Sequence, residues 1–598
     1  MPSAQRLDDN PCRPRHFKPP PCAPVIADAA GGELLEAART RLLLAGMLFA
    51  LVFLVVTGRL VQVVATSGEN SGVEARAGVH HLVQPPPPVR ADIVDRNGTL
   101  LATNLDSPAL YVDSKVMLQA GENPDQAARA ITTALPDLSL PEIRAKLASG
   151  KNFAYLTRTL TPRQEYAVNN LGIPGVEFQP NEKRSYPLGD LAAHVIGYCS
   201  VDNIGQAGLE RGLNPAIRNN GKPVMLALDA RVQFVLKDEL QQVITQFDAK
   251  GAAGIIMNVR TGEIVAMASL PDFDPNHPPT TDPKRETSED KDRIFNKITS
   301  GEYELGSVFK IFNTAMALDS GVATMTSSFD ARNPIKIGRF TIEDYHGKHR
   351  VLSVPEIFAY SSNIGSARMA VAAGADRQRA FLAKLGLLES VPIEFDKVEV
   401  ARPHFPAIWR EINVMTIAFG HGIAVTPLHM ITATAAIVNG GILHPPTMLK
   451  VPAGTRVPGE RVISARTSDQ MRKLMRLVVE SGTAKLAEAA GYVVGGKTGT
   501  AEKNQNGHYE EKKLLSSFIG AFPMNDPQYV ILTLVDEPHG NKQSHGYATA
   551  GWTVAPATSR IIQRIAPLLG VAPQDENSPE IVKSLQIESL AGKKLEYN

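Results

Sequence analysis

Ser307 and Lys310 have the residue types and the spacing of a nucleophile with its base. Residues at i and i+3 lie on the same face of a helix. A serine hydroxyl is a weak nucleophile until a base takes its proton, and a lysine is such a base when burial lowers its pKa. The other residues of 308–312 are apolar. We therefore expect 307–319 to form a buried helix, whose first backbone N–H groups can stabilise an oxyanion.

The Ser-x-x-Lys spacing alone is weak evidence. A chain of this length and ordinary composition contains about one or two such sequences by chance. Ser288 and Lys291 match as well, but they lie in the charged run 281–293, which is typical of a solvated loop. Only Ser307 combines the spacing with an apolar context, so we expect the chemistry there.

Ser361, Ser362 and Asn363 follow the mostly apolar segment 355–360. The hydroxyl of Ser361 can pass protons between a nucleophile, a lysine and a leaving group, and the Asn363 amide can orient a substrate carbonyl and the lysine. Serine and asparagine also favour helix N-caps and turns, so a purely structural interpretation of this triplet stays open.

Lys497, Thr498, Gly499 and Thr500 form a third cluster, on a predicted strand. A cation and two hydroxyls can bind a carboxylate. A glycine lets a substrate backbone approach closely and add as an extra strand. The triplet Lys-Thr-Gly is expected only about 0.1 times by chance in a chain of this composition. We therefore predict a substrate-binding strand here.

Two other kinds of site match parts of the sequence. Residues 491–498 fit the G-x-x-x-x-G-K-[ST] pattern of nucleotide-binding P-loops. A P-loop needs a strand before it and a helix after it, whereas a helical pattern precedes this segment and a polar, glycine-containing one follows. The pairs His80–His81 and His346–His349 lack helical ligand spacing and nearby cysteines, so we favour solvated or structural histidines over a metal site.

Composition excludes several classes of protein. The chain has 598 residues, of which 43% are hydrophobic and 21% charged, as in ordinary globular proteins. The 62 Lys and Arg residues are balanced by 61 Asp and Glu residues, so nucleic-acid binding has no electrostatic support. Three cysteines are too few for a disulfide scaffold or a cysteine-based zinc site.

The segment 42–58 is apolar and carries no charge. A spanning helix needs about 20 mostly apolar residues, and the run reaches that length if Arg59 extends to the interface. We expect one uncleaved membrane anchor over 41–65. Basic residues in the preceding head slightly favour an N-terminus in the cytoplasm, which places everything after residue 66 on the other side.

Strand patterns over 251–269 and 492–538 enclose a largely helical stretch. This arrangement predicts one antiparallel sheet built from both ends of the region. Asn97-Gly98, between alternating apolar residues, predicts a hairpin. The expected regions are a Pro-rich disordered head (1–40), the anchor (41–65), a Pro-rich linker (66–89), an N-terminal module (90–221), a catalytic domain (222–571) and a polar tail (572–598).

The three clusters occur in the order S-x-x-K, S-x-N, K-T-G, which is the signature of penicillin-binding proteins and serine β-lactamases. Residues 303–310 (YELGSVFK) resemble the Y-x-P-G-S-x-F-K segment of class B penicillin-binding proteins, with Leu305 in place of proline. Residues 90–102 (RADIVDRNGTLLA) resemble the box that opens the family's N-terminal module, with Ala91 in place of glycine. Further similar segments are 184–197, 205–210, 261–276 and 419–430.

This resemblance implies an α+β multidomain fold. Its parts are a single N-terminal transmembrane helix, an extended α+β pedestal or dimerisation-type module, and a penicillin-binding transpeptidase domain like that of serine β-lactamases, with an antiparallel sheet flanked by helices. It implies a peptidoglycan D,D-transpeptidase that needs no metal and no organic cofactor. The implied site is Ser307 as nucleophile, Lys310 as base, Ser361 and Asn363 in proton relay and orientation, Lys497, Thr498, Gly499 and Thr500 in substrate binding, and the N–H groups of Ser307 and Thr500 as oxyanion hole.

The form of residues 497–503 (KTGTAEK) is similar to that of the division-specific members, and the elongation-specific paralogue is the alternative. The implied partners are peptidoglycan stem peptides, β-lactam antibiotics, a septal glycan-polymerising membrane protein and other division proteins. The implied location is the bacterial inner membrane, with the catalytic domain in the periplasm. A hydrolase with the same acyl-enzyme and a non-catalytic division scaffold or penicillin sensor stay open as other classes.

Overall fold

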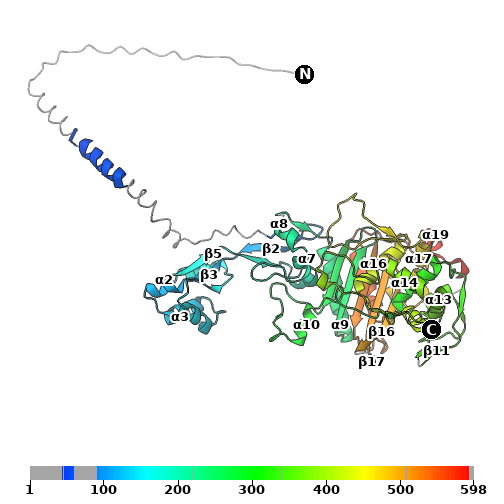
Figure 1. The fold of residues 1–598 in the computed structure, drawn as a ribbon. Coiled ribbons are helices and arrows are strands. Elements are labelled where there is room, and N and C mark those ends of the chain that lie inside the picture. Colours follow the sequence, from blue (N-terminus) through cyan, green and yellow to red (C-terminus); the bar gives the residue numbers. More distant parts are fainter. Residues whose placement is uncertain are drawn as a thin grey trace, which may run out of the picture. The chain divides into compact units, whose positions relative to one another are not determined.

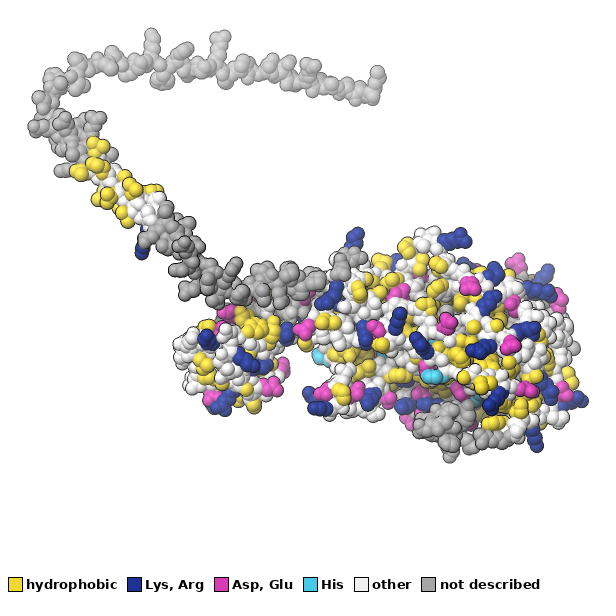
Figure 2. Space-filling view, in the orientation of Figure 1, with side chains coloured by type: hydrophobic (Ala, Val, Ile, Leu, Met, Phe, Trp, Pro, Cys, Tyr) yellow, Lys and Arg dark blue, Asp and Glu magenta, His cyan; other side chains and the backbone are white. Residues whose placement is uncertain are grey.

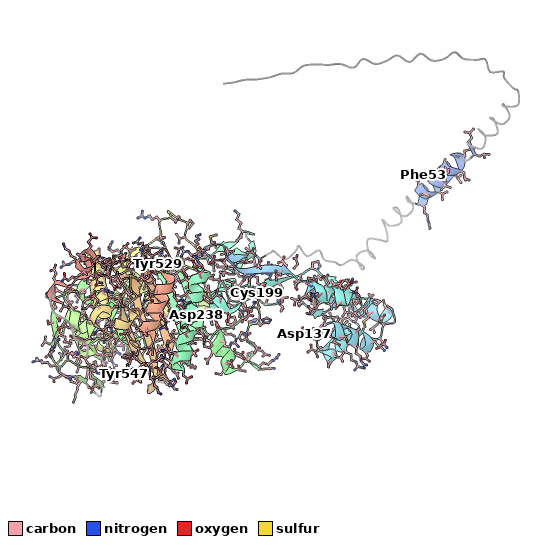
Figure 3. All side chains as sticks on the ribbon, turned by 180° about the vertical axis from the view of Figure 1, so that it is seen from behind. Phe53, Asp137, Cys199, Asp238, Tyr529 and Tyr547 are labelled. Atoms are coloured by element: carbon pink, nitrogen blue, oxygen red, sulfur yellow. The ribbon has the colours of Figure 1, made fainter. Side chains whose placement is uncertain are left out.

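The computed structural model describes residues 43–44, 46–59, 90–219, 221–338, 340–505 and 508–590. The chain divides into two compact units, residues 1–87 and 88–598 (Figure 1). In the first unit, residues 43–44 and 46–59 are helical, and their large apolar side chains, such as Phe53, are exposed (Figure 3). Among the described residues, no helix combines the length and the hydropathy that crossing a bilayer requires. The expected head and linker, and both ends of the expected anchor, lie outside the described residues.

The second unit begins with an N-terminal module of short strands and helices. Its elements are β1 (Ile93–Val94), β2 (Leu100–Asp106), β3 (Ala109–Val112), α2 (Ser114–Gln119), α3 (Pro124–Ala134), α4 (Leu140–Leu147), β4 (Ala154–Thr157), α5 (Pro162–Asn169), β5 (Val176–Gln179), β6 (Glu182–Ser185), η1 (Gly189–Ala192), α6 (Ala193–Ile196), α7 (Gly208–Gly212), α8 (Asn214–Asn219) and β7 (Val224–Met225). They form a four-stranded sheet in the order β6-β2-β1-β7 and a three-stranded sheet in the order β4-β3-β5.

The predicted hairpin at Asn97-Gly98 is confirmed, because β1 and β2 pair antiparallel around this turn. Gly98 has φ +88°, a conformation that glycine adopts without steric cost. The Asn97 amide donates to Asp229 at 3.0 Å, at the N-cap of the first long helix of the next region. The turn therefore contacts the region that follows as well as closing the hairpin.

Three of the segments that carry the family resemblance meet in a buried ion cluster. Arg90 and Arg184 both pair with Glu210 at 2.6 Å, and all three side chains are at most 3% exposed. Arg90 also donates to the Asn214 amide oxygen at 2.5 Å, and Arg184 donates to the Ala91 carbonyl at 3.0 Å. Because these segments lie far apart in the chain, the cluster fixes how they pack together.

The larger region contains one five-stranded antiparallel sheet in the order β16-β17-β18-β8-β9. The strands are β8 (Gly251–Asn258), β9 (Ile264–Leu270), β16 (Gly495–Gln505), β17 (His508–Phe522) and β18 (Tyr529–Asp536). The sheet is thus built from the two ends of the region, which confirms the prediction. Every residue of β9 and β18 is buried, so both faces are covered, since successive side chains of a strand alternate between faces.

Helices α9 (Ala230–Phe247) and α18 (Val554–Ile565) cover one face, where Gly254 faces Leu236 and Thr533 bonds to Thr558 at 2.7 Å. Helices α16 (Pro427–Val438) and α17 (Ala465–Ser481) pack on the other face (Figure 1).

The remaining elements are α10 (Ser288–Ile294), η2 (Gly306–Phe309), α11 (Lys310–Asp319), β10 (Ser328–Asp330), β11 (Ile335–Ile337), β12 (Phe340–Ile342), β13 (Val351–Ser353), α12 (Val354–Ala359), α13 (Asn363–Ala373), α14 (Ala375–Lys384), η3 (Lys397–Glu399), α15 (Glu411–Ile417), β14 (Ile442–Leu443), β15 (Glu460–Arg461), η4 (Lys485–Ala487), α19 (Pro579–Leu585) and η5 (Glu588–Leu590).

The structure differs from three local expectations. The segment with Ser288 is helix α10 rather than a loop, because Thr287 and Asp290 form a capping box at its start. It has no buried residue, so Ser288 is solvated as expected. The helix expected over 307–319 begins with a 3₁₀ turn, η2, and becomes α-helical at Lys310.

The third difference lies in 572–598, expected to be a polar tail. Part of it folds as α19, because Ile581 and Leu585 are four residues apart and present one apolar face to the core.

Both signs of charge are spread over the visible surface of the second unit (Figure 2). This distribution agrees with the formal net charge of +1. Cys199 is the free cysteine of the described residues, and burial raises the pKa of its thiol to about 12. It is therefore a protonated, unreactive thiol at neutral pH.

Candidate active site

Ser307 and Lys310 lie one turn apart where η2 runs into α11. Gly306, with φ +59°, turns the chain immediately before Ser307, the predicted nucleophile. A side chain at Gly306 would come 3.1 Å from the Thr500 carbonyl oxygen, so η2 rests directly on the edge strand β16. The Lys310 amine is completely buried, and its Nζ lies 3.0 Å from Ser307 Oγ.

Lys310 Nζ lies within hydrogen-bond distance of four oxygen atoms. It lies 2.5 Å from the Ser361 carbonyl oxygen, 3.0 Å from Ser361 Oγ and 2.7 Å from Asn363 Oδ1, in addition to Ser307 Oγ. An ammonium donates three hydrogen bonds. A neutral amine donates two, here to the two carbonyl oxygens, and its lone pair accepts from a serine hydroxyl. Each form makes three hydrogen bonds, but only the neutral amine has a lone pair that can take the proton of Ser307, as a base must.

Electrostatics also favour a neutral Lys310 amine. Burial lowers the pKa of Lys310 well below its usual range, and the nearby cation Lys497 lowers this pKa further. Asp344 acts in the opposite direction. Burial also lowers the pKa of Lys497, to about 7. Two ammonium groups in one buried site repel each other, so a proton on one lysine disfavours a proton on the other.

Ser361 lies between the two lysines. Its Oγ is 3.0 Å from Lys310 Nζ and 3.0 Å from Lys497 Nζ. Its backbone has φ +59°, which costs about 1–3 kcal/mol for a residue other than glycine. Such strain concentrates where a side chain is held for a function. The hydroxyl is thus placed to relay protons. The structural interpretation of the triplet also applies, because the next residue, Ser362, is the N-cap of α13.

The Lys-Thr-Gly-Thr segment lies in β16, which pairs only with β17 and leaves its other edge without a strand partner among the described residues. Lys497 faces Ser361, whereas Thr498 and Thr500 alternate to the other side of the strand. The Thr498 hydroxyl lies 2.6 Å from the Thr483 hydroxyl, and Thr500 Oγ1 accepts from the Ala550 N–H at 3.1 Å.

The structure explains Gly499 by close packing within the protein, rather than by the expected close approach of a substrate backbone. A Cβ at this position would lie 2.5 Å from the Leu305 carbonyl oxygen and 2.9 Å from Ser517 Oγ. Glycine is therefore required for β16 to approach the turn that carries Ser307. The structure brings together Ser307, Lys310, Ser361, Asn363 and Lys497, and it places Thr498 and Thr500 on the same strand.

The nucleotide-binding alternative is wrong. Gly495 begins strand β16, and Lys497 and Thr498 lie inside it, whereas a P-loop would lead into a helix. Of the candidate metal histidines, His80 and His81 lie outside the described residues. His346 packs against Tyr345, and His349 lies 3.4 Å from the Arg332 carbonyl oxygen. Within the ranges described above, no group of three or more metal-ligating side chains occurs.

Two charged features near the site were not anticipated. Asp344 bonds to the first residues of α13, and the sequence carries no local signal for it, since it lies 18 residues before Ser362. Glu304, three residues before Ser307, pairs with His421 at 3.5 Å and accepts from the Gly422 N–H at 3.0 Å. Burial lowers the pKa of His421, so its imidazole is neutral at neutral pH.

The sequence of this chain is similar to those of known proteins along most of its length. Residues 252–558 match the penicillin-binding protein transpeptidase domain, and residues 85–222 match the penicillin-binding protein dimerisation domain. A Caulobacter vibrioides protein named as the peptidoglycan D,D-transpeptidase FtsI is 42% identical over 82% of this chain and 84% of its own length. The peptidoglycan D,D-transpeptidase PenA of Neisseria meningitidis is 30% identical over 83% of this chain and 87% of its own length.

Solved structures have the same fold. Penicillin-binding protein 3 of Mycobacterium tuberculosis, in complex with aztreonam, has a TM-score of 0.63 at 24% identity and covers 82% of this chain and 98% of its own. Its complex with ampicillin has a TM-score of 0.64 and covers 84% of this chain and 99% of its own. The two domain matches, the relatives and the geometry of the three clusters agree: the chain belongs to the class B penicillin-binding proteins.

Proposed function

We propose that this chain is a serine D,D-transpeptidase that cross-links peptidoglycan stem peptides at the division septum and is acylated by β-lactams. The observation that carries the proposal is the buried Lys310 amine, 3.0 Å from the Ser307 hydroxyl and held by Ser361 and Asn363. A relative named as the peptidoglycan D,D-transpeptidase FtsI supports the substrate class, and structures of a related protein with aztreonam and ampicillin support β-lactam binding.

The reaction follows from the positions of the groups. Ser307 Oγ attacks the carbonyl carbon of the penultimate D-Ala, and its proton passes to the neutral Lys310 amine. The carbon–nitrogen bond to the terminal D-Ala breaks, and that leaving nitrogen receives a proton through Ser361. An ester of Ser307 results. The amine of a second stem peptide then attacks the ester, releases Ser307 and forms the cross-link.

The negative charge that develops on the substrate carbonyl oxygen in the transition state needs N–H donors to stabilise it. We assign this function to the backbone N–H groups of Ser307 and Thr500, because η2 and β16 approach each other at Gly306 and Thr500. Lys497 is the cation of the site, and we assign its charge to attracting the terminal carboxylate of the substrate. The hydroxyls of Thr498 and Thr500, on the other side of β16, are assigned to contacting that carboxylate.

We further propose that the chain is anchored in the bacterial inner membrane by residues 41–65, with its N-terminus in the cytoplasm and its catalytic domain in the periplasm. The apolar run 42–58 and its exposed helical residues 46–59 support this location. A septal glycan-polymerising membrane protein and other division proteins would be its partners, as the similarity to FtsI suggests.

The products distinguish this function from the others. The full chain in detergent would be given a stem pentapeptide ending in D-Ala-D-Ala and an amine acceptor. We expect release of D-Ala together with a cross-linked product, both abolished by Ser307→Ala. Release of D-Ala with hydrolysed donor alone would indicate a carboxypeptidase. Neither product, from protein that still forms a penicillin adduct, would favour a division scaffold.

A further inference from the structure

Asp344 lies in the segment between β12 and β13 and contacts the N-terminus of α13. Its Oδ1 accepts from the N–H groups of Asn363 at 2.6 Å and Ile364 at 3.0 Å. Its Oδ2 accepts from the Ser362 hydroxyl at 2.7 Å. Three consecutive residues after Ser361 are therefore held by one carboxylate from a distant part of the chain.

These bonds fix the strained turn that serves the two lysines. Before the turn, the N–H groups of Ser361 and Ser362 donate to the carbonyls of Phe358 at 3.3 Å and Ile357 at 2.9 Å. After it, Asp344 binds residues 362–364. A residue other than glycine keeps a positive φ only when its surroundings over-determine it. Asp344 supplies the downstream half of this constraint, and Ser361 Oγ stays 3.0 Å from both lysine amines.

Asp344 also acts on Lys310 through its charge. Burial and Lys497 lower the pKa of Lys310, and Asp344 raises it. The other titratable groups near Lys310 are His421, from the segment between α15 and α16, and Glu304, which pairs with His421. His421 is uncharged at neutral pH because burial lowers its pKa. Asp344 is thus the carboxylate that opposes the two effects disfavouring a proton on Lys310.

We propose that Asp344 is a positioning residue for acyl transfer: it holds Ser361 and Asn363 on Lys310 and sets the pH range in which Lys310 serves as base. This inference rests on the function proposed above. It adds to the three clusters a fourth group, which touches neither the nucleophile nor the substrate and acts through α13.

The variant Asp344→Asn removes the negative charge of residue 344 but can keep its hydrogen bonds to residues 362–364. Its amide oxygen can still accept from the two backbone N–H groups, and its NH₂ can donate to Ser362 Oγ. Only the charge is lost, so the pKa of Lys310 falls. The rate constant of Ser307 acylation by a penicillin, measured against pH, should keep its acid limb but move it to lower pH. Asp344→Ala, which also loses the bonds, should show the same shift and a maximal acylation rate about tenfold to a hundredfold lower.

Asp319 offers a matched control. Its Oδ1 accepts from the Ser464 N–H at 2.8 Å and from the Thr467 hydroxyl at 2.9 Å, at the start of α17. It is therefore also an aspartate that caps a helix, but it lies at the opposite end of α11 from Lys310. Asp319→Asn should leave the acid limb in its wild-type position.

The possible results distinguish a failure of the inference about Asp344 from a folding defect and from a failure of the proposed function. An acid limb that stays at the wild-type pH in Asp344→Asn would overturn the inference. If Asp344→Asn fails to fold, judged by its unfolding midpoint, Asp344→Glu decides. A glutamate keeps the charge, so its limb should stay near the wild-type pH even if its maximal rate is lower, and a shifted limb would overturn the inference. A wild-type chain that is never acylated at Ser307 would refute the proposed function instead.

Discussion

Lys310 and Lys497 share the Ser361 hydroxyl but need opposite charge states. Lys310 works as a base only without its extra proton, and it loses this ability as the pH falls through its depressed pKa. Lys497 attracts a carboxylate only as a cation, and it loses its charge as the pH rises through about 7. The pairing explains how one buried site holds both a base and a carboxylate-binding cation.

We therefore expect a bell-shaped pH profile of kcat/KM for substrates with a terminal carboxylate. The acid limb reports Lys310, and the alkaline limb reports the loss of the Lys497 charge. A β-lactam ester that lacks the carboxylate should show the acid limb only. Acylation rates of a β-lactam with a free carboxylate and of its ester, measured from about pH 5 to about pH 9, test this expectation. This pH range spans the pKa of Lys497. The same alkaline limb for both compounds would contradict the assignment of Lys497.

Gly499 gives a second prediction. Gly499→Ala places a methyl group 2.5 Å from the Leu305 carbonyl oxygen, a backbone atom that cannot rotate away. Strand β16 must then move off η2. The free energy of unfolding should fall by about 1–3 kcal/mol, and acylation of Ser307 should slow because the proposed oxyanion donors, the N–H groups of Ser307 and Thr500, separate. A variant with wild-type acylation and an unchanged unfolding midpoint would show that the contact is not restrictive.

The elements of the N-terminal module depend on the buried cluster of Arg90, Arg184 and Glu210. Glu210→Ala leaves two buried arginines without their carboxylate, and breaking a buried ion pair in this way costs about 3–5 kcal/mol. Chemical denaturation of the purified chain should show the loss. Asp125→Ala is the control, because its pair with Arg144 is exposed and should contribute about 0–1 kcal/mol. Equal effects of the two substitutions would contradict a structural function of the cluster.

Sequence patterns predicted the elements whose signals are local. The hairpin at Asn97-Gly98 and the strands at both ends of the catalytic region follow from alternation and turn residues. Sequence patterns do not indicate the helix over 288–294, because its capping box lies in a run of charges and no apolar face marks it. Sequence patterns do not distinguish the 3₁₀ turn η2 from an α-helix, because the two differ in hydrogen bonding rather than in composition.

The site was predictable in its residues more than in its contacts. Spacing and order predicted Ser307, Lys310, Ser361, Asn363 and the Lys-Thr-Gly-Thr strand as site residues, and the folded chain brings them together. Their functions in the reaction stay a prediction. The carboxylate of Asp344 escaped notice because only the folded chain brings it to α13. The packing reason for Gly499 escaped notice too, because the carbonyl it faces belongs to η2. Long-range contacts of this kind leave no trace in local spacing.

For the whole molecule, the proposed anchor is open to a direct test. The substitutions Leu51→Arg and Phe53→Arg lie near the centre of the apolar run. Each arginine raises the free energy of membrane insertion by about 2.5–3.5 kcal/mol at the middle of a spanning helix. The wild-type chain should stay with membranes during alkaline extraction, and the double variant should appear in the soluble fraction. The same two substitutions at Val116 and Leu118, which are exposed in α2, should change nothing. A wild-type chain that is extracted would refute the anchor.

The identity of the nucleophile is tested most directly by labelling membranes with a fluorescent penicillin. Wild type, Ser307→Ala and Ser288→Ala would be compared, the last being the exposed serine with the same spacing to a lysine. We predict a labelled band at the chain's mass of 64.4 kDa in the wild type and in Ser288→Ala, and none in Ser307→Ala. A band that survives in Ser307→Ala, or a folded wild-type chain without a band, would contradict acyl transfer through Ser307.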